Sequence, residues 1–229
     1  MRTLANLVMG VAMALAGCVT ALAAPPDGFV DLEAYIPGIV VEARYAGNHN
    51  FVGQPIDGYE APKVFLSVEA ANALKTAQHR LAAQGMTLKV FDGYRPQRAV
   101  DHFMRWVSDA NDTKNKAAYY PDVAKHRLVR EGYIAEKSGH SRGSTLDLTI
   151  AHIMPDGSVQ ELDMGSPWDF FGPISHPSSK AVSDDARANR MLLRMSMLAA
   201  GFKPYEAEWW HFTLTREPYP NTYFDFPVE

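Results

Sequence analysis

Hydrophobic and polar residues alternate in the segment STLDLTI, which ends at Ile150. In an extended chain, successive side chains point to opposite faces, so this pattern predicts a strand over residues 145–150. Its faces hold Leu146, Leu148 and Ile150 on one side, and Thr145, Asp147 and Thr149 on the other. The strand therefore carries one ionisable residue, Asp147, on its polar face.

Two other segments show the longer period of an amphipathic helix. SVEAANALKTAQHRLAAQG begins with Ser67, a good N-cap, and ends at Gly85, a good helix stop. Its apolar residues recur at helical spacing, at Ala70, Leu74, Ala77 and Leu81. Further helices are predicted over 99–108 and 185–200, and Gly201 would end the second of them.

Two more strands are predicted, MTLKVFD over 86–92 and EWWHFTL over 208–214. The helices and strands do not alternate regularly along the chain, as they would in a parallel α/β fold. We therefore predict an α+β fold with a central antiparallel sheet flanked by helices.

Composition indicates one globular domain and argues against nucleic-acid binding. The chain has 229 residues, of which 47% are hydrophobic and 21% charged, enough apolar material for a single core. The net charge is −4 and the pI about 6.1, and no run of Lys or Arg occurs. A phosphate backbone requires a concentrated basic surface, which this sequence does not provide.

The first 24 residues are typical of an export signal. Arg2 precedes an apolar stretch, and small residues lead to Ala24 just before Pro25. We expect the mature domain to span 25–229 in the periplasm; a retained membrane span is the alternative. The single cysteine, Cys18, lies in LAGC, which resembles a lipoprotein cleavage site, so a lipid anchor there and ordinary cleavage after the alanines both remain open. In either case the mature domain has no disulfide.

His140 and Asp147 form the first candidate site. His140 precedes the predicted strand across Ser141, Arg142 and Gly143, a turn that can bring the imidazole back over the face of Asp147. Such a pair could ligate a metal. A hydrogen bond between the two side chains at a strand end is the alternative.

Glu208 and His211 form the second candidate site, in EWWH. Residues three apart in a regular strand point to opposite faces, so a shared site requires a twist, a bulge or a metal at the strand end. The alternative is an amphipathic edge strand with Glu208 in solvent.

The two pairs together suggest a catalytic zinc site. Three protein ligands leave one position on zinc for water, and zinc lowers the pKa of that water to about 7. Glu208 suits the role of proton acceptor better than that of ligand. Arg95, in FDGYRPQR, could stabilise an oxyanion, or could form a surface ion pair; Asp92 could orient Arg95, or cap the turn.

These motifs resemble the D-alanyl-D-alanine dipeptidases of the VanX type, within the zinc D,D-peptidases, whose pattern is S-x-H-x(6)-D followed by E-x-x-H. Here the pattern reads SGHSRGSTLD and EWWH, and NFVGQPIDGYE, DGYRPQRAV, MGSPWDFF and EPYPNTYFDFPV extend the resemblance. The likeness runs from about Asp31 to the C-terminus. Several ordered blocks make it more specific than a single motif.

The resemblance implies a hedgehog/D,D-peptidase-like zinc fold and assigns roles to several residues. It implies one Zn²⁺ on His140, Asp147 and His211, Glu208 as general base and acid, and Arg95 as the transition-state stabiliser. It also points to substrate-binding residues: Tyr45, Tyr59, Ser138 and Asp169.

The implied reaction is hydrolysis of the dipeptide D-Ala-D-Ala to two D-alanines. An exported D,D-carboxypeptidase acting on longer peptidoglycan stems is one alternative, and a zinc-stabilised binding domain without catalysis is another. The expected partner is the small dipeptide. Membrane attachment is expected only through a lipidated Cys18, and the sequence leaves the oligomeric state open.

Overall fold

The computed structural model describes residues 25–229. The predicted export signal and Cys18 lie outside this range. Within it, no helix has both the length and the apolar character needed to cross a membrane.

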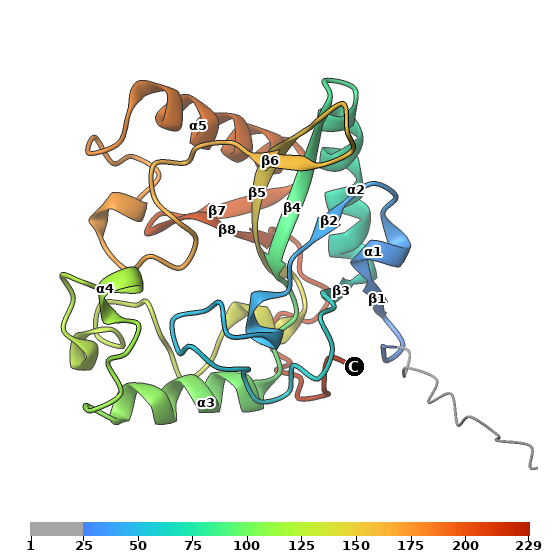
Figure 1. Cartoon of the computed structure of the whole chain (residues 1–229). Coiled ribbons are helices and arrows are strands. Elements are labelled where there is room, and N and C mark those ends of the chain that lie inside the picture. The colour runs from blue at the N-terminus through green and yellow to red at the C-terminus, as the bar shows by residue number, and fades with distance from the viewer. Residues whose placement is uncertain (1–24) are drawn as a thin grey trace, which may run out of the picture.

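The main sheet has six strands, and five of them follow the order β2-β4-β5-β8-β7, with β6 paired to β5 (Figure 1). The strands of this sheet are β2 (Val40–Val41), β4 (Met86–Asp92), β5 (Thr145–Ile153), β6 (Val159–Glu161), β7 (Phe202–Tyr205) and β8 (Glu208–Leu214). The strands β1 (Phe29–Asp31) and β3 (Phe65–Ser67) form a separate antiparallel pair. The three predicted strands are therefore all present and adjacent, as β4, β5 and β8.

The α+β prediction is confirmed, and the central strands are antiparallel as expected. One edge departs from the expectation, because β2 runs parallel to β4. Parallel neighbours need a crossover connection, and the helix α2 supplies it between these two strands.

The helices are α1 (Leu32–Tyr35), α2 (Val68–Ala82), α3 (Gln97–Ser108), α4 (Lys116–Tyr119) and α5 (Asp184–Ala199). Ser67 caps α2 as predicted, since its hydroxyl accepts a hydrogen bond from the backbone N–H of Ala70 at 3.4 Å. The apolar face of α2 is buried. The predicted helices at 99–108 and 185–200 correspond to α3 and α5, with bounds that differ by one or two residues.

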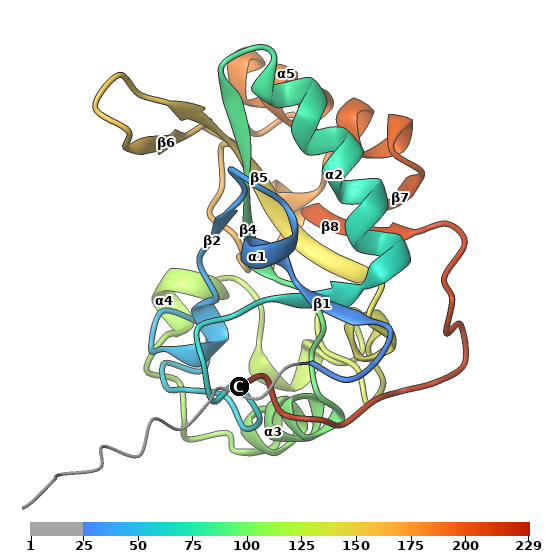
Figure 2. The same cartoon turned by 90° about the vertical axis from the view of Figure 1, so that its right-hand side faces the viewer.

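The helices flank the sheet in two groups. Figure 2 shows α2 and α5 together on one side of the sheet. In Figure 1, α3 and α4 lie with long loops in a separate layer below it. Both faces of β5 are buried: the apolar face reaches the core, and Thr145, Asp147 and Thr149 are covered as well. A carboxylate thus lies where little water reaches it.

Candidate active site

Strand register brings together Asp147 of β5 and His211 of β8. The two residues are direct partners across the antiparallel pair, and on β4 the partner of Asp147 is Asp92. Directly opposed residues project from the same face of a sheet. Three ionisable side chains therefore lie in a row across three strands.

A single short turn brings His140 to this row. Residues Gly139–Arg142 form a 3-10 helix, whose first turn is capped by the Ser138 hydroxyl accepting from the backbone N–H of His140 at 3.2 Å. Gly143 ends the turn with φ of +79°, and a Cβ there would lie 2.3 Å from the ring of Phe29. Glycine is therefore required at this position, both by backbone conformation and by space.

The backbone fixes the orientation of the His140 ring. Its Nδ1 lies 2.8 Å from the carbonyl oxygen of Gly93, which can only accept a hydrogen bond, so Nδ1 carries the proton. The lone pair is then on Nε2, which lies 3.4 Å from Asp147 Oδ1 and 3.4 Å from His211 Nδ1. A ring held in this way is arranged like a metal-ligating histidine with its outer hydrogen bond in place.

The three side chains fit a metal ion. Ligand atoms of His140, Asp147 and His211 all lie within 4.8 Å of one another. Asp147 Oδ1 is buried and has no hydrogen-bond partner among residues 25–229, although His211 Nδ1 is 3.2 Å away. An orphaned buried carboxylate oxygen facing two imidazole nitrogens is what a cation would satisfy, and the two-nitrogen, one-oxygen set suits zinc.

The charges in this cluster shift its pKa values. Burial lowers the pKa of His211, but the neighbouring carboxylates of Asp147 and Glu208 outweigh burial and raise it to about 9. Burial raises the pKa of Asp147, but the imidazoles of His140 and His211 outweigh burial and hold it well below its ordinary value. The cluster therefore strongly favours an added positive charge.

Glu208 shares the site with His211 despite the odd spacing. The pairing of β7 with β8 shifts register between Pro204 and Tyr205, which pair with Phe212 and Glu208 respectively. This irregularity lets Glu208 turn toward His211, so that its Oε2 lies 3.4 Å from His211 Nδ1. A break in the regular strand, of the kind that a shared site requires, is therefore present, and the alternative of a solvent-exposed Glu208 is wrong, because the residue is only 8% exposed.

Arg95 lies beside the cluster with its side chain only 12% exposed, and it does not form a surface ion pair. Its Nε and Nη2 donate to Asp92 Oδ2 at 3.0 and 2.7 Å, and Nη2 lies 3.8 Å from Asp147 Oδ2. The other carboxylate oxygen of Asp92 accepts from the hydroxyl of Tyr59 at 2.6 Å. Asp92 therefore orients Arg95, and the hydroxyl of Tyr59 holds Asp92 in place through its other oxygen.

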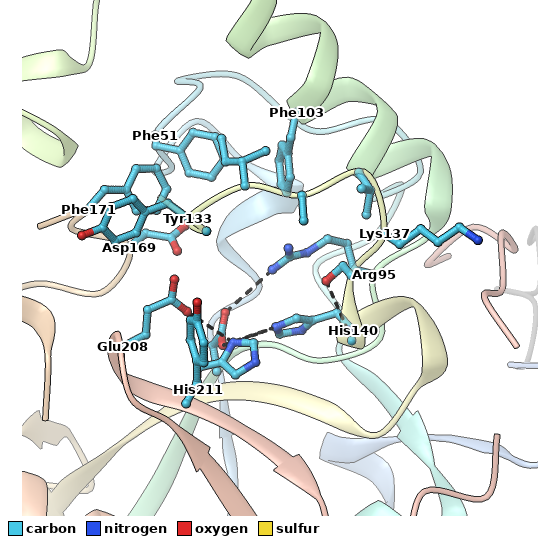
Figure 3. A pocket seen from close by; sticks show the side chains of 18 of the residues that line it. Phe51, Arg95, Phe103, Tyr133, Lys137, His140, Asp169, Phe171, Glu208 and His211 are labelled. Atoms are coloured by element: carbon cyan, nitrogen blue, oxygen red, sulfur yellow. Dashed lines mark hydrogen bonds and ion pairs between the residues drawn. The ribbon is translucent and has the colours of Figure 1, made fainter. Parts of the chain in front are cut away.

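These groups surround one pocket of about 180 Å³ (Figure 3). His140 and His211 lie at its floor, with Glu208 and Arg95 beside them, and Asp147 also lines it. Ligand pockets are commonly about 300–1,000 Å³, so this one suits a small molecule.

The four expected substrate residues lie in different places. Tyr45, Ser138 and Asp169 line the pocket, whereas Tyr59 is not part of its wall. The Tyr45 hydroxyl donates to Asp169 Oδ2 at 2.6 Å, and Asp169 is buried with φ of +60°. Burial, and then the charge of Asp147, raise the pKa of Asp169 well above its ordinary value.

Sequence reasoning missed the aromatic part of the pocket and one contact to the metal cluster. The aromatic lining is Phe51, Phe103, Tyr133, Phe171 and Tyr205, in addition to Tyr45. The indole N–H of Trp168 donates to Asp147 Oδ2 at 3.4 Å. Trp168 stands next to Asp169 in SPWDFF, so the same block could have pointed to it. Phe171 ends the same block, whereas the other aromatic residues come from two further loops, from α3 and from β7.

Comparison with known proteins gives consistent results. The peptidase M15 model described as D-ala-D-ala dipeptidase matches residues 26–229. A D-alanyl-D-alanine dipeptidase of Streptomyces coelicolor is 44% identical over 201 residues, covering 87% of this chain and 98% of the relative. Proteins of the same name from Enterococcus faecalis and Enterococcus faecium are 42% and 41% identical over 202 residues, each covering 88% of this chain and 98% of the relative.

Proposed function

The chain belongs to the M15 peptidase family of D-alanyl-D-alanine dipeptidases and is a metallopeptidase; we propose that it hydrolyses D-Ala-D-Ala to two D-alanines using one zinc ion. One observation carries this proposal. The two imidazoles and the carboxylate that fit a metal share a small pocket with the carboxylate of Glu208, 3.4 Å from His211, and with the largely covered guanidinium of Arg95.

His140, Asp147 and His211 would hold the metal. A zinc ion there supplies a Lewis acid for the peptide carbonyl and lowers the pKa of water to about 7. Glu208 accepts the proton of the attacking water at its carboxylate and then donates it to the departing amine, which is general base and acid catalysis by one residue. Its burial beside His211 keeps the carboxylate directed into the pocket.

Arg95 stabilises the negative charge that develops on the carbonyl oxygen. Its guanidinium is held by Asp92 and also lies over the rings of Tyr45 and Phe103, with Cζ 5.1 Å from each centroid. A donor fixed before the reaction needs no reorganisation when the charge appears. The structure therefore supports Arg95 in the role of an oxyanion donor.

The pocket also has groups for both ends of a dipeptide. Asp169, held by Tyr45, would pair with the ammonium group, and Ser138 would bind the carboxylate. Tyr59 lies outside the wall, so its part in substrate binding would be indirect, through Asp92 and Arg95. A direct contact of Tyr59 with substrate stays a prediction.

The small pocket favours a dipeptide over the longer peptidoglycan stems that a D,D-carboxypeptidase would accept. A binding domain without catalysis would need neither a buried base nor a fixed oxyanion donor. The experiment compares turnover of D-Ala-D-Ala by the wild type and Glu208→Ala at matched zinc content. Glu206→Ala is the control, since Glu206 is an exposed glutamate two residues away.

We expect the wild type and Glu206→Ala to hydrolyse the dipeptide and Glu208→Ala to fail. Equal turnover by all three would show that Glu208 is not the base. If the wild type hydrolyses only longer stems, the carboxypeptidase proposal replaces this one; no hydrolysis of either substrate would favour the binding domain.

We also propose that the enzyme is exported to the periplasm, on the basis of the signal-like residues 1–24. A periplasmic enzyme has no access to cytoplasmic D-Ala-D-Ala, so its role there would be recovery of wall-derived D-alanine. Mass spectrometry of the mature N-terminus would distinguish ordinary cleavage from a lipid anchor on Cys18.

A further inference from the structure

Arg190 of α5 is a buried cation outside the pocket. It is only 2% exposed. Its guanidinium donates to the backbone carbonyls of Met164, Ile174 and His176 at 2.6, 2.9 and 2.9 Å, and to the hydroxyl of Ser166 at 3.1 Å. All four acceptors are neutral and all lie on one segment, residues 164–176.

The acceptors lie on both sides of the part of this segment that reaches the active site. Met164 and Ser166 precede Trp168 and Asp169, and Ile174 and His176 follow them. One side chain thus ties the beginning of the segment to its end. Because the distance between these two ends is fixed, the residues between them can take fewer positions.

Two residues in that span contact the site. Trp168 donates to the metal-cluster carboxylate Asp147, and Asp169 accepts from Tyr45 in the pocket wall. Asp169 also has a left-handed backbone, with φ of +60°, which a residue with a side chain rarely adopts. Such a conformation persists only where the surroundings determine it.

Ser166 connects the same guanidinium to β8. Its hydroxyl accepts from the indole N–H of Trp209 at 3.0 Å, and Trp209 directly follows Glu208. Arg190 is therefore hydrogen-bonded to the segment that carries Asp169, and Ser166 is hydrogen-bonded in turn to the residue next to Glu208.

We propose that Arg190 is a positioning residue, which holds residues 164–176 so that Asp169 can pair with the substrate ammonium and Trp168 can hold Asp147. This inference rests on the proposed dipeptidase function. Arg190 itself does not line the pocket. Its loss should therefore weaken recognition of the ammonium group more than it weakens the chemical step.

The test compares zinc-loaded wild type with Arg190→Met, Arg190→Lys and the control Arg194→Met. Arg194 lies one turn further along α5, in an ion pair with Glu206 near the surface. For each protein, kcat/KM is measured for D-Ala-D-Ala and for propionyl-D-alanine, which lacks only the amino group. Hydrogen exchange of the backbone amides in 164–176 is measured on the same preparations.

We expect Arg190→Met to reduce the preference for the free amine by about tenfold, mainly through KM, because a charge-assisted contact is lost. Exchange in 164–176 should be faster, Arg190→Lys should fall between Arg190→Met and the wild type, and Arg194→Met should match the wild type. If Arg190→Met does not fold, the comparison of Arg190→Lys with Arg194→Met decides the question.

An unchanged preference in a folded Arg190 variant would overturn the proposal, whether or not exchange became faster. Failure of the wild type to hydrolyse either compound would instead refute the dipeptidase function. In that case the exchange measurement alone would decide whether Arg190 orders the segment.

Discussion

The charge of Asp92 holds Arg95 in place, and Asp92→Asn tests this directly. The amide can keep its oxygen toward Arg95 and turn its nitrogen toward the hydroxyl of Tyr59, so the substitution removes charge with little change in shape. Among residues 25–229, Asp147 at 3.8 Å is then the one remaining carboxylate within ion-pair distance of Arg95. Without the charge of Asp92, the guanidinium is held less firmly in the position from which it would contact the carbonyl.

The loss in free energy of unfolding can be worked out from the two hydrogen bonds between Arg95 and Asp92. A bond to a charged acceptor contributes about 1 kcal/mol more than a neutral one, so two bonds give about 2 kcal/mol. Complete loss of a partner from a buried pair costs about 3–5 kcal/mol, but Asp147 remains, so we expect about 2–3 kcal/mol. For a chain of 229 residues this lowers Tm by about 4–12 °C.

Activity should fall further than stability. Loss of one oxyanion donor typically reduces kcat by about 10²–10³-fold, and a displaced Arg95 should approach that loss. The assays are thermal unfolding and hydrolysis of D-Ala-D-Ala at equal zinc content. Asp225→Asn is the matched control, since Asp225 binds Arg98 through several hydrogen bonds but both side chains are nearly half exposed.

Asp225→Asn should lower the free energy of unfolding by less than about 1 kcal/mol and leave activity unchanged, because exposed ion pairs contribute little to stability. The reasoning is refuted if Asp92→Asn has the same Tm as the wild type and keeps kcat/KM within about threefold of the wild-type value. Arg95 would then be held by its packing on Tyr45 and Phe103, not by charge.

Three further predictions concern the metal, the turn and the pocket wall. A strong chelator should abolish activity and zinc should restore it, whereas magnesium, which prefers oxygen ligands, should not; activity that persists without metal would contradict the zinc site. Gly143→Ala should destabilise the fold by several kcal/mol and displace His140, because its Cβ would lie 2.3 Å from the ring of Phe29. Gly157→Ala, with a similar φ of +82° but nothing within 4 Å, should cost only about 1–2 kcal/mol in chemical denaturation; equal losses would mean that the contact does not matter. Tyr45→Phe removes the 2.6 Å hydrogen bond to Asp169 and should raise KM about tenfold with a smaller change in kcat; a loss confined to kcat would argue against a role in substrate binding.

Local patterns predicted the strands and the faces of their residues. Alternation placed Asp147 opposite the leucines of β5, and the glycine after Arg142 predicted the turn that carries His140. Both features depend on residues close together in the chain. For the same reason, strand geometry alone showed that Glu208 and His211 can share a site only with a twist, a bulge or a metal at the strand end.

Features that depend on distant residues could not be read from such patterns. Nothing near Asp147 indicates that His211 is its partner in β8, since pairing is decided by packing of the whole sheet. The resemblance to known dipeptidases gave this grouping instead. It also named Tyr59, whose hydroxyl the structure directs to Asp92 and away from the pocket, a position set by the loop before β3.

The spacing of the three proposed metal ligands along the chain also affects when an ion could be captured. His140 and Asp147 are made well before His211, which belongs to one of the last strands to emerge during synthesis. A nascent or translocating polypeptide therefore carries only two ligands of the set, and tight binding has to wait until β8 joins the sheet. If the chain is exported, as proposed above, and crosses the membrane unfolded, zinc would be acquired at the destination, and its supply there would limit how much active enzyme accumulates.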